Sequence, residues 1–258
     1  MKKRFTAVLL SLMLMSGLMP ATAFAADPEG VWTDYAAEVF AGGTGTQDDP
    51  YLVETAEQLA KVAKDVNDGT TEYDGVSFRL EDDIDLSAHY WRPIGCFLTS
   101  SDNRTFRGNI DGNDKTITGL TVDESERELQ AGFFGKIGNS TTGVTAGAKN
   151  LTISGASIYT REKNLYPSAG ILAGYAQANE GHQIVFENIR VSGSVEIAMT
   201  DGAISAGGMF GYADRIQAVN CKAENIFVSG SSNSGGFVGS TGDSVYQNCS
   251  ALGTVHGA

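Results

Sequence analysis

A short apolar block that ends in glycine occurs four times in the second half of this chain. It reads AGFFG, GILAG, GGMFG and GGFVG, and its closing residues are Gly135, Gly174, Gly211 and Gly239. These glycines stand 39, 37 and 28 residues apart. Self-similarity at such intervals is typical of repeat proteins, in which each repeat packs mainly on its neighbours. The sequence therefore predicts a stack of repeated structural units.

An asparagine opens a second repeated element after each block. This element is strand-like and begins at Asn150, Asn188, Asn220 or Asn248. From closing glycine to asparagine the distances are 15, 14, 9 and 9 residues. The insertions thus fall on the connections while two strand cores persist, which is how loops behave on a scaffold.

The N-terminus reads as a secretory signal peptide over residues 1–25. Lys2, Lys3 and Arg4 form the basic region, residues 5–19 are mostly apolar, and Ala23-Phe24-Ala25 provides small residues for cleavage before Ala26. The alternative, a membrane anchor, is disfavoured because the apolar run is short and leads directly into the cleavage pattern. No second run of about 18 apolar residues follows, so we expect an exported chain with no membrane span in its mature form.

The acidic net charge of the chain limits which macromolecules it can bind. The chain carries 18 basic and 31 acidic residues, a net charge of −13, and loss of the signal peptide would leave 15 basic residues and −16. An acidic surface repels phosphate backbones, so we expect no nucleic-acid partner.

Cys221 and Cys249 occupy the same repeat position, so stacking would bring them within disulfide range. We favour a ladder of two buried thiols, because Cys96 stands alone.

Residues 26–75 are expected to form a lead-in and an N-terminal cap. Thr55 and Gln58 have the spacing of a capping box, and the apolar residues that follow share one helical face. Gly69 then provides a residue that tolerates a positive φ beyond the helix end. The pattern predicts one amphipathic helix over residues 56–67. Such a helix would cover the exposed end of a repeat stack, since terminal repeats need caps for solubility.

From residue 76 to 258 the pattern is β. Short alternating stretches at 76–80, 84–86 and 116–122 are separated by Gly, Asn and Asp, and a turn is expected at 111–113. No helical period separates the later strands, so a βαβ arrangement is excluded. A propeller blade needs about 40 residues, more than the shortest interval allows. We therefore predict an all-β fold, a right-handed parallel β-helix with one N-terminal capping α-helix.

Stacked repeats would place like residues on top of one another. One expected column is Phe134, Ala173, Phe210 and Val238, and a second is Phe133, Leu172, Met209 and Phe237. The repeat glycines are expected to adopt turn conformations that other residues resist. On that hypothesis, Gly211→Val and Gly239→Val destabilise the stack because both glycines have positive φ.

The repeat over 235–257 resembles the GLUG motif of bacterial surface proteins, and residues 43–59 resemble the block that leads into such repeats. Segments 83–87, 91–95 and 106–113 match as well, so the resemblance covers about 41–257. It implies a right-handed β-helix on an exported, often wall-associated, adhesin-like protein. Such repeats also lie beside the peptidase domain of IgA1-specific metallopeptidases. This chain has no His-Glu-x-x-His motif, which excludes carrying over the peptidase activity, and we expect it to be the front part of a longer surface polypeptide.

No catalytic, cofactor-binding or metal-binding residue is assigned from the sequence, and no cofactor is implied. His89, His182 and His256 lack metal-ligand spacing and a neighbouring nucleophile, so they are interpreted as surface residues. The acidic run 81–85 is the best calcium candidate, but a turn whose Asp side chains cap backbone amides is the favoured interpretation.

Three function classes remain open. A polysaccharide-degrading β-helix needs converging carboxylates, or a carboxylate–calcium site with a basic residue that abstracts a proton. Here Asp111, Asp114 and Asp123 are scattered. A binding module would use the inserts at 136–149, 159–168 and 176–187 for glycans or host surface proteins, with stacking faces offered by Tyr159, Tyr166, Tyr175 and Tyr212. For Tyr175 and Tyr212, shielding of a sheet flank is favoured. The third class is a structural stalk. We expect a non-catalytic module for adhesion or display.

Overall fold

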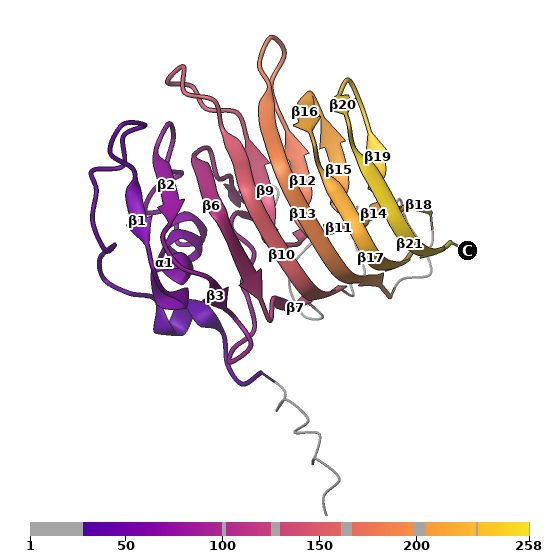
Figure 1. Ribbon diagram of the computed structural model, residues 1–258, viewed down its shortest axis with the longest axis horizontal. Helices are drawn as coiled ribbons and strands as arrows, with labels where there is room; N and C mark the ends of the chain where they lie inside the picture. The colour runs from indigo at the N-terminus through magenta and orange to yellow at the C-terminus, as the bar shows by residue number, and fades with distance from the viewer. Residues whose placement is uncertain are drawn as a thin grey trace, which may run out of the picture.

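The computed structural model describes residues 28–99, 102–124, 130–160, 167–198, 205–230 and 232–257. The predicted signal peptide lies outside these ranges. The described chain is mostly β, with parallel sheets and a single α-helix (Figure 1). Within the described ranges, no helix is both long and apolar enough to cross a membrane.

The largest sheet has 11 described strands and runs the length of the molecule. Its path is β1 (Tyr51–Val53), β2 (Ser77–Leu80), β6 (Asn109–Thr118), β10 (Gly147–Thr160), β13 (Ile184–Ile197), β16 (Ile216–Val219) and β20 (Val245–Gln247). Beside this path pair β3 (Ile84–Asp85), β7 (Thr121–Glu124), β17 (Lys222–Ser229) and β21 (Ser250–His256). All of these pairings are parallel.

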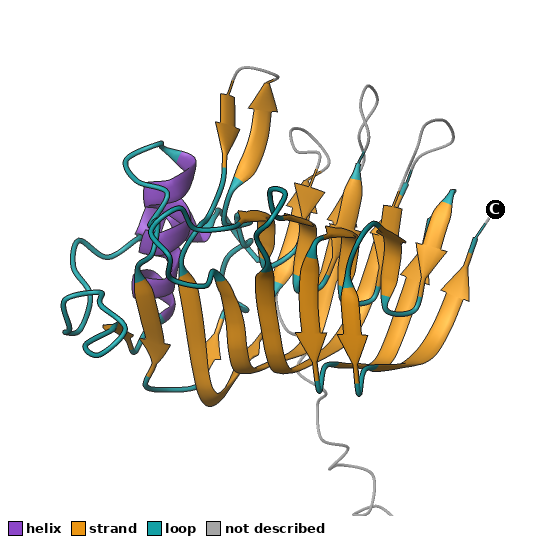
Figure 2. Cartoon of the chain, turned by 90° about the horizontal axis from the view of Figure 1, so that it is seen from above, coloured by secondary structure: helices purple, strands orange, loops and turns teal. Residues whose placement is uncertain are grey.

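Two smaller parallel sheets lie behind the large one (Figure 2). One joins β8 (Gln130–Ala131), β11 (Ser168–Gly170), β14 (Ser205–Gly207) and β18 (Asn233–Gly235). The other joins β9 (Phe134–Gly138), β12 (Ala173–Gln177), β15 (Phe210–Asp214) and β19 (Val238–Thr241). A separate antiparallel hairpin pairs β4 (Cys96–Thr99) with β5 (Asp102–Arg104).

From Gln130 onward the described chain visits the three sheets in the same order four times. We call each circuit a rung: β8-β9-β10, β11-β12-β13, β14-β15-β16-β17 and β18-β19-β20-β21. The predicted repeats are these rungs. Ala173 pairs with both Phe134 and Phe210, and Phe210 pairs with Val238, so the first predicted column is confirmed. Backbone hydrogen bonds connect the second column as well, with Leu172 N–H donating to Met209 O at 3.0 Å and Met209 N–H donating to Phe237 O at 2.9 Å.

The prediction that the repeat glycines have positive φ is wrong. Neither Gly211 nor Gly239 is among the residues with positive φ. A Cβ at Gly211 would instead lie 2.5 Å from the backbone N of Ala169 and 2.6 Å from the backbone O of Gly174, in the preceding rung. The two smaller sheets meet at these positions, so glycine is needed because backbones approach closely and not because the chain turns.

The helix α1 (Ala56–Asn67) begins and ends at the predicted residues. The hydroxyl of Thr55 accepts a hydrogen bond from Gln58 N–H at 3.3 Å, and the Gln58 side chain accepts one from Glu54 N–H at 2.7 Å. Gly69 follows with a φ of +73°. The helix lies at the N-terminal end of the stack of strands (Figure 2), and its apolar face belongs to the same buried cluster as the sheet side chains. A 3₁₀ turn (Trp32–Tyr35) lies against it.

The predicted turn at 111–113 lies inside β6 instead of ending a strand. Asn113 and Asp114 do adopt turn-like φ values of 50° and 60°, and the register against β10 shifts at this point. The strand therefore bends without leaving the sheet. A residue with positive φ recurs at the equivalent position of each rung, and in the last two rungs it separates β16 from β17 and β20 from β21.

Candidate functional site

A column of four asparagines marks one bend in every rung, within β10 and β13 and then between β16 and β17 and between β20 and β21. Asn150, Asn188, Asn220 and Asn248 have φ values of 51° to 54°. This left-handed region is costly for most residues, but asparagine tolerates it because its short polar side chain bonds locally. The repeated asparagine is therefore explained by the backbone, and it was this residue, not the glycine, that the positive φ required.

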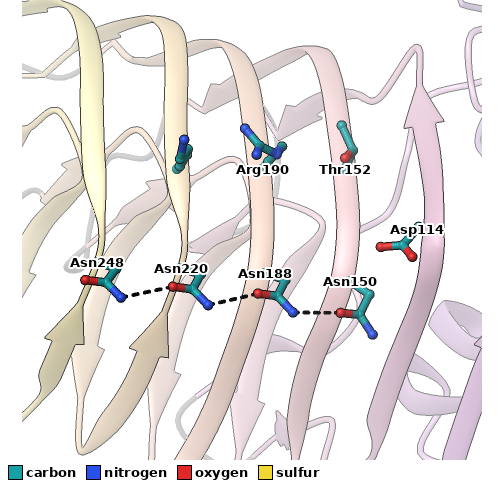
Figure 3. Close-up of a pocket in the computed structure, with 8 residues that line it drawn as sticks. Asp114, Asn150, Thr152, Asn188, Arg190, Asn220 and Asn248 are labelled. Carbon is teal, nitrogen blue, oxygen red and sulfur yellow. Dashed lines mark hydrogen bonds between the residues drawn. The ribbon is translucent and has the colours of Figure 1, made fainter.

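The asparagine side chains form a continuous ladder of hydrogen bonds (Figure 3). Asn248 Nδ2 donates to Asn220 Oδ1 at 3.2 Å, Asn220 Nδ2 to Asn188 Oδ1 at 3.1 Å, and Asn188 Nδ2 to Asn150 Oδ1 at 2.9 Å. The last amide, Asn150 Nδ2, donates to Asp111 Oδ1 at 3.1 Å. A carboxylate only accepts, so Asp111 sets the direction of the first bond and hence of the whole ladder.

The ladder lines one side of an open groove of about 440 Å³ on the outer surface of the large sheet. We call it the ladder groove. Its lining residues are Asp114, Asn150, Thr152, Asn188, Arg190, Asn220, Lys222 and Asn248. In Figure 3 the asparagines form one row, Arg190 and Thr152 belong to a second row, and Asp114 lies at the end opposite Asn248. The groove offers amides, a hydroxyl and two cations to a ligand.

The second row follows the register of the strands. Thr116, Thr152, Arg190, Lys222 and Ser250 occupy equivalent positions on successive strands. Arg190 and Lys222 are thus direct neighbours across a strand pair. Glu224 approaches both cations, with Oε2 at 3.6 Å from Arg190 Nη1 and Oε1 at 4.0 Å from Lys222 Nζ. All three side chains are roughly half exposed, so each pair is weak.

The acidic run 81–85 leads into the short strand β3, and two of its carboxylates accept hydrogen bonds from backbone amides. Asp83 Oδ1 accepts from Thr116 N–H at 2.7 Å and Asp85 Oδ1 from Ser87 N–H at 2.9 Å, while Glu81 pairs with Arg79 at 2.5 Å. The bonds from Asp83 and Asp85 are of the kind expected for Asp side chains that cap backbone amides. Across the parts of the chain that the structure describes, no three His, Cys, Asp or Glu side chains gather closely enough to hold a metal ion.

The histidines lie on different parts of the molecule. The ring of His89 stacks on Tyr35, with centroids 3.9 Å apart, and its Nδ1 lies 2.5 Å from Glu29 O. His256 lies in the last strand, beside Phe227. His182 lines a polar hollow of about 410 Å³ between loops 139–145 and 181–183. This hollow is where two of the predicted inserts meet.

Tyr175 and Tyr212 stack on each other with ring centroids 4.7 Å apart. Lys136 Nζ lies 5.5 Å from the centroid of the Tyr175 ring, so the three form one column on the sheet of β9, β12 and β15. Burial lowers the pKa of Lys136 to about 8. The half-buried rings cover the flank of this sheet, which is the shielding role favoured for Tyr175 and Tyr212 from the sequence. Tyr166 lies outside the described residues.

Cys221 and Cys249 are free thiols in the structure, and so is the buried Cys96. Burial raises the pKa of the Cys221 thiol to about 12. Its Sγ contacts Val219 O at 3.3 Å, and Cys249 Sγ contacts Gln247 O at 3.4 Å. The equivalent contacts in consecutive rungs form the expected ladder, but only Cys221 is buried, whereas Cys249 is partly exposed because it lies in the last described rung.

The sequence interpretation did not single out the ladder groove. It recognised the asparagine repeat as a strand marker and placed ligand binding on the inserts. The available signal was that asparagine, a poor strand former, recurred at one position in all four repeats.

The two similar sequences match this chain over small parts of much larger proteins. No family model matches this chain. A protein of Evansella cellulosilytica named "Putative Gly-rich membrane protein" is 36% identical over 125 residues, which are 46% of this chain and 12% of that protein. Halomucin of Haloquadratum walsbyi is 32% identical over 165 residues, 62% of this chain and 2% of its own length. The chain thus spans a small fraction of these relatives.

One solved structure shares the fold. It is described as "a putative immunoglobulin A1 protease from Bacteroides ovatus", and it superposes with a TM-score of 0.55 over 84% of this chain and 70% of that one. The sequence identity is 19%, so the likeness concerns the fold alone.

Proposed function

We propose that this chain is a non-catalytic module of an exported bacterial surface protein and that it acts in adhesion or display by binding glycans along the ladder groove. The observation that carries the proposal is the groove itself. It crosses four successive rungs and is lined by amides, a hydroxyl, two cations and, at one end, the carboxylate of Asp114. Such groups bond to the hydroxyls of a sugar chain without reacting with it.

We further propose that the fold is a right-handed parallel β-helix built from GLUG-like repeats. The ordered visits to three parallel sheets support this interpretation. Connections between parallel strands of one sheet are right-handed in nearly all proteins. A helix of rungs provides a rigid, extended face on which a linear ligand can lie.

Placement outside the cell rests on two observations. The first 25 residues have the pattern of a secretory signal. The similar sequence from Evansella belongs to a protein named "Putative Gly-rich membrane protein", and the similar fold to one described as "a putative immunoglobulin A1 protease". These names favour a surface module within a larger polypeptide.

The absence of catalysis is proposed from the composition of the groove. Glycoside hydrolysis uses two carboxyl groups that face each other across the bond. Among the described residues that line the ladder groove, one carboxylate occurs, Asp114, at its end. The other lining groups are amides, a hydroxyl and two cations, so the groove lacks the second carboxyl group that this chemistry uses. We therefore expect no release of reducing sugar ends from a bound polysaccharide.

The test is a glycan array probed with the mature chain from residue 26. Thr152→Trp places a large side chain in the groove, and Tyr212→Ala alters the stacked tyrosines on another sheet as a matched control. We expect glycan binding that Thr152→Trp abolishes and Tyr212→Ala preserves. Loss of binding only in Tyr212→Ala would move the site to the tyrosine column. No binding to any glycan, with host-protein binding also absent, would leave the stalk function and refute the proposal.

A further inference from the structure

We propose that the ladder groove selects acidic glycans and holds a carboxylate of the ligand on Arg190 and Lys222. This inference rests on the proposed function, because it names the class of glycan that the same groove takes. The structure leads to it through the local balance of charge, which differs from that of the chain as a whole.

Two cations face one carboxylate at this point of the groove. Arg190 and Lys222 are register partners on adjacent parallel strands, and neighbouring strands lie about 4.8 Å apart. Like charges placed opposite each other across a strand pair are destabilising. Glu224 serves both cations, at 3.6 Å and 4.0 Å, which are long distances for a charged hydrogen bond. A second carboxylate would complete the charge balance.

A guanidinium and an ammonium side by side suit a sugar carboxylate. The arginine fork donates two parallel hydrogen bonds to a carboxylate, and the lysine contributes a point charge. Both side chains line the groove and remain about half exposed, so they are available to a ligand. Glu224 competes for the same donors and therefore weakens the site for anions.

The asparagine ladder would hold the rest of the glycan. Each amide has two N–H donors and two acceptor positions; the ladder uses one of each at Asn150, Asn188 and Asn220, and one donor at Asn248. The remaining groups recur at the strand spacing of about 4.8 Å, which is comparable to the length of one sugar unit in an extended chain. Neutral hydroxyls of successive sugars match this row.

Because the chain is acidic overall, its affinity for an acidic glycan depends on Arg190 and Lys222. The mature chain from residue 26 carries −16, so its long-range field opposes an anionic ligand. Asp114 also excludes a carboxylate from its end of the groove. Affinity for an acidic glycan must then depend on contacts at Arg190 and Lys222, whereas affinity for a neutral glycan would not.

The experiment compares charged and neutral forms of the same sugar backbone. Hexamers of galacturonate, mannuronate and a glucuronate-containing glycan are titrated into the mature chain by calorimetry, each beside its methyl ester, which keeps the ring and removes the charge. The variants are Arg190→Gln, Lys222→Gln and Glu224→Gln. Lys64→Gln is the matched control, because it removes one positive charge from the exposed face of α1, away from the groove.

We expect at least one acidic hexamer to bind about tenfold more tightly than its ester. Lys222→Gln and Arg190→Gln should each weaken it about threefold, in line with the strength of exposed ion pairs. Glu224→Gln should tighten it, and Lys64→Gln should leave it unchanged. An opposite or absent effect of Glu224→Gln, or esters that bind as well as acids, would overturn this inference while leaving the glycan-binding proposal standing. Binding to acidic peptides in place of every glycan would overturn both.

Discussion

Replacing Gly211 with alanine tests the finding that the repeat glycines are needed for close approach of backbones. The added Cβ would lie 2.5 Å from Ala169 N and 2.6 Å from Gly174 O. Both are backbone atoms that cannot rotate away, so the preceding rung must shift. Overpacking of this kind costs up to about 3 kcal/mol, and the lower entropy of the unfolded alanine chain returns about 1 kcal/mol. We expect a net loss of about 2 kcal/mol, or a Tm lower by about 4–8 °C.

Gly155 is the matched control because it has a positive φ but open space around it, whereas Gly211 has close neighbours but no positive φ. Its φ is +67°, and no heavy atom lies within 4 Å of an added Cβ. Gly155→Ala should cost about 1 kcal/mol through backbone strain alone, and Gly155→Asn should be nearly neutral because asparagine tolerates this φ. Gly211→Asn should be at least as costly as Gly211→Ala, since steric contact does not depend on that tolerance.

The assay is urea denaturation of the mature chain, monitored by far-UV circular dichroism. The m-value, the slope of the free energy of unfolding against urea concentration, should be the same for all variants. The reasoning is refuted if Gly211→Ala changes the free energy of unfolding by less than about 0.5 kcal/mol, or if Gly211→Asn is better tolerated than Gly211→Ala. Either result would mean that the two smaller sheets do not approach as closely as the structure places them.

Three further predictions concern other parts of the stack. Asn188→Ala should cost about 3 kcal/mol, from two ladder hydrogen bonds and a strained φ of 54°, while Asn188→Gly loses only the hydrogen bonds; equal losses in urea denaturation would contradict this. Lys136 has a pKa lowered to about 8, so between pH 8 and 10 the unfolded chain binds a proton that the folded chain does not. The stability of the wild type relative to Lys136→Met should therefore rise over that interval in thermal melts, and a flat difference would exclude it. A thiol reagent at pH 8 should label Cys249 before the buried Cys221, whose pKa is about 12, as mapped by mass spectrometry; equal labelling of the native protein would be incompatible with that burial.

The parts of the fold that could be predicted are those that depend on local or repeated patterns. The helix over 56–67 follows from a capping pair and an apolar period, both contained in one short segment. The column of Phe134, Ala173, Phe210 and Val238 follows from repetition, since equal positions of stacked units must meet. Neither inference needs knowledge of distant contacts.

Why glycine is required at the repeat positions could not be predicted in the same way. A glycine needed for a positive φ and one needed for a close approach look alike in a sequence. The atoms that exclude a side chain at Gly211 belong to residues 37 and 42 positions earlier. Only the arrangement of the two smaller sheets brings them together. The turn expected at 111–113 was misplaced for a related reason, because pairing with β10 keeps that segment in the sheet.

The ladder groove explains why the repeats reveal architecture more readily than ligand. Its asparagine row repeats in all four rungs because each asparagine relieves backbone strain and bonds to the next, down to Asp111. The neighbouring row, from Thr116 to Ser250, changes at nearly every strand because the fold places no such demand on it. A chain of rungs can therefore keep one polar row for stability and vary the other for recognition. On this view, exchanging Arg190 and Lys222 for threonine should alter which glycan binds and leave the free energy of unfolding within about 0.5 kcal/mol of the wild type.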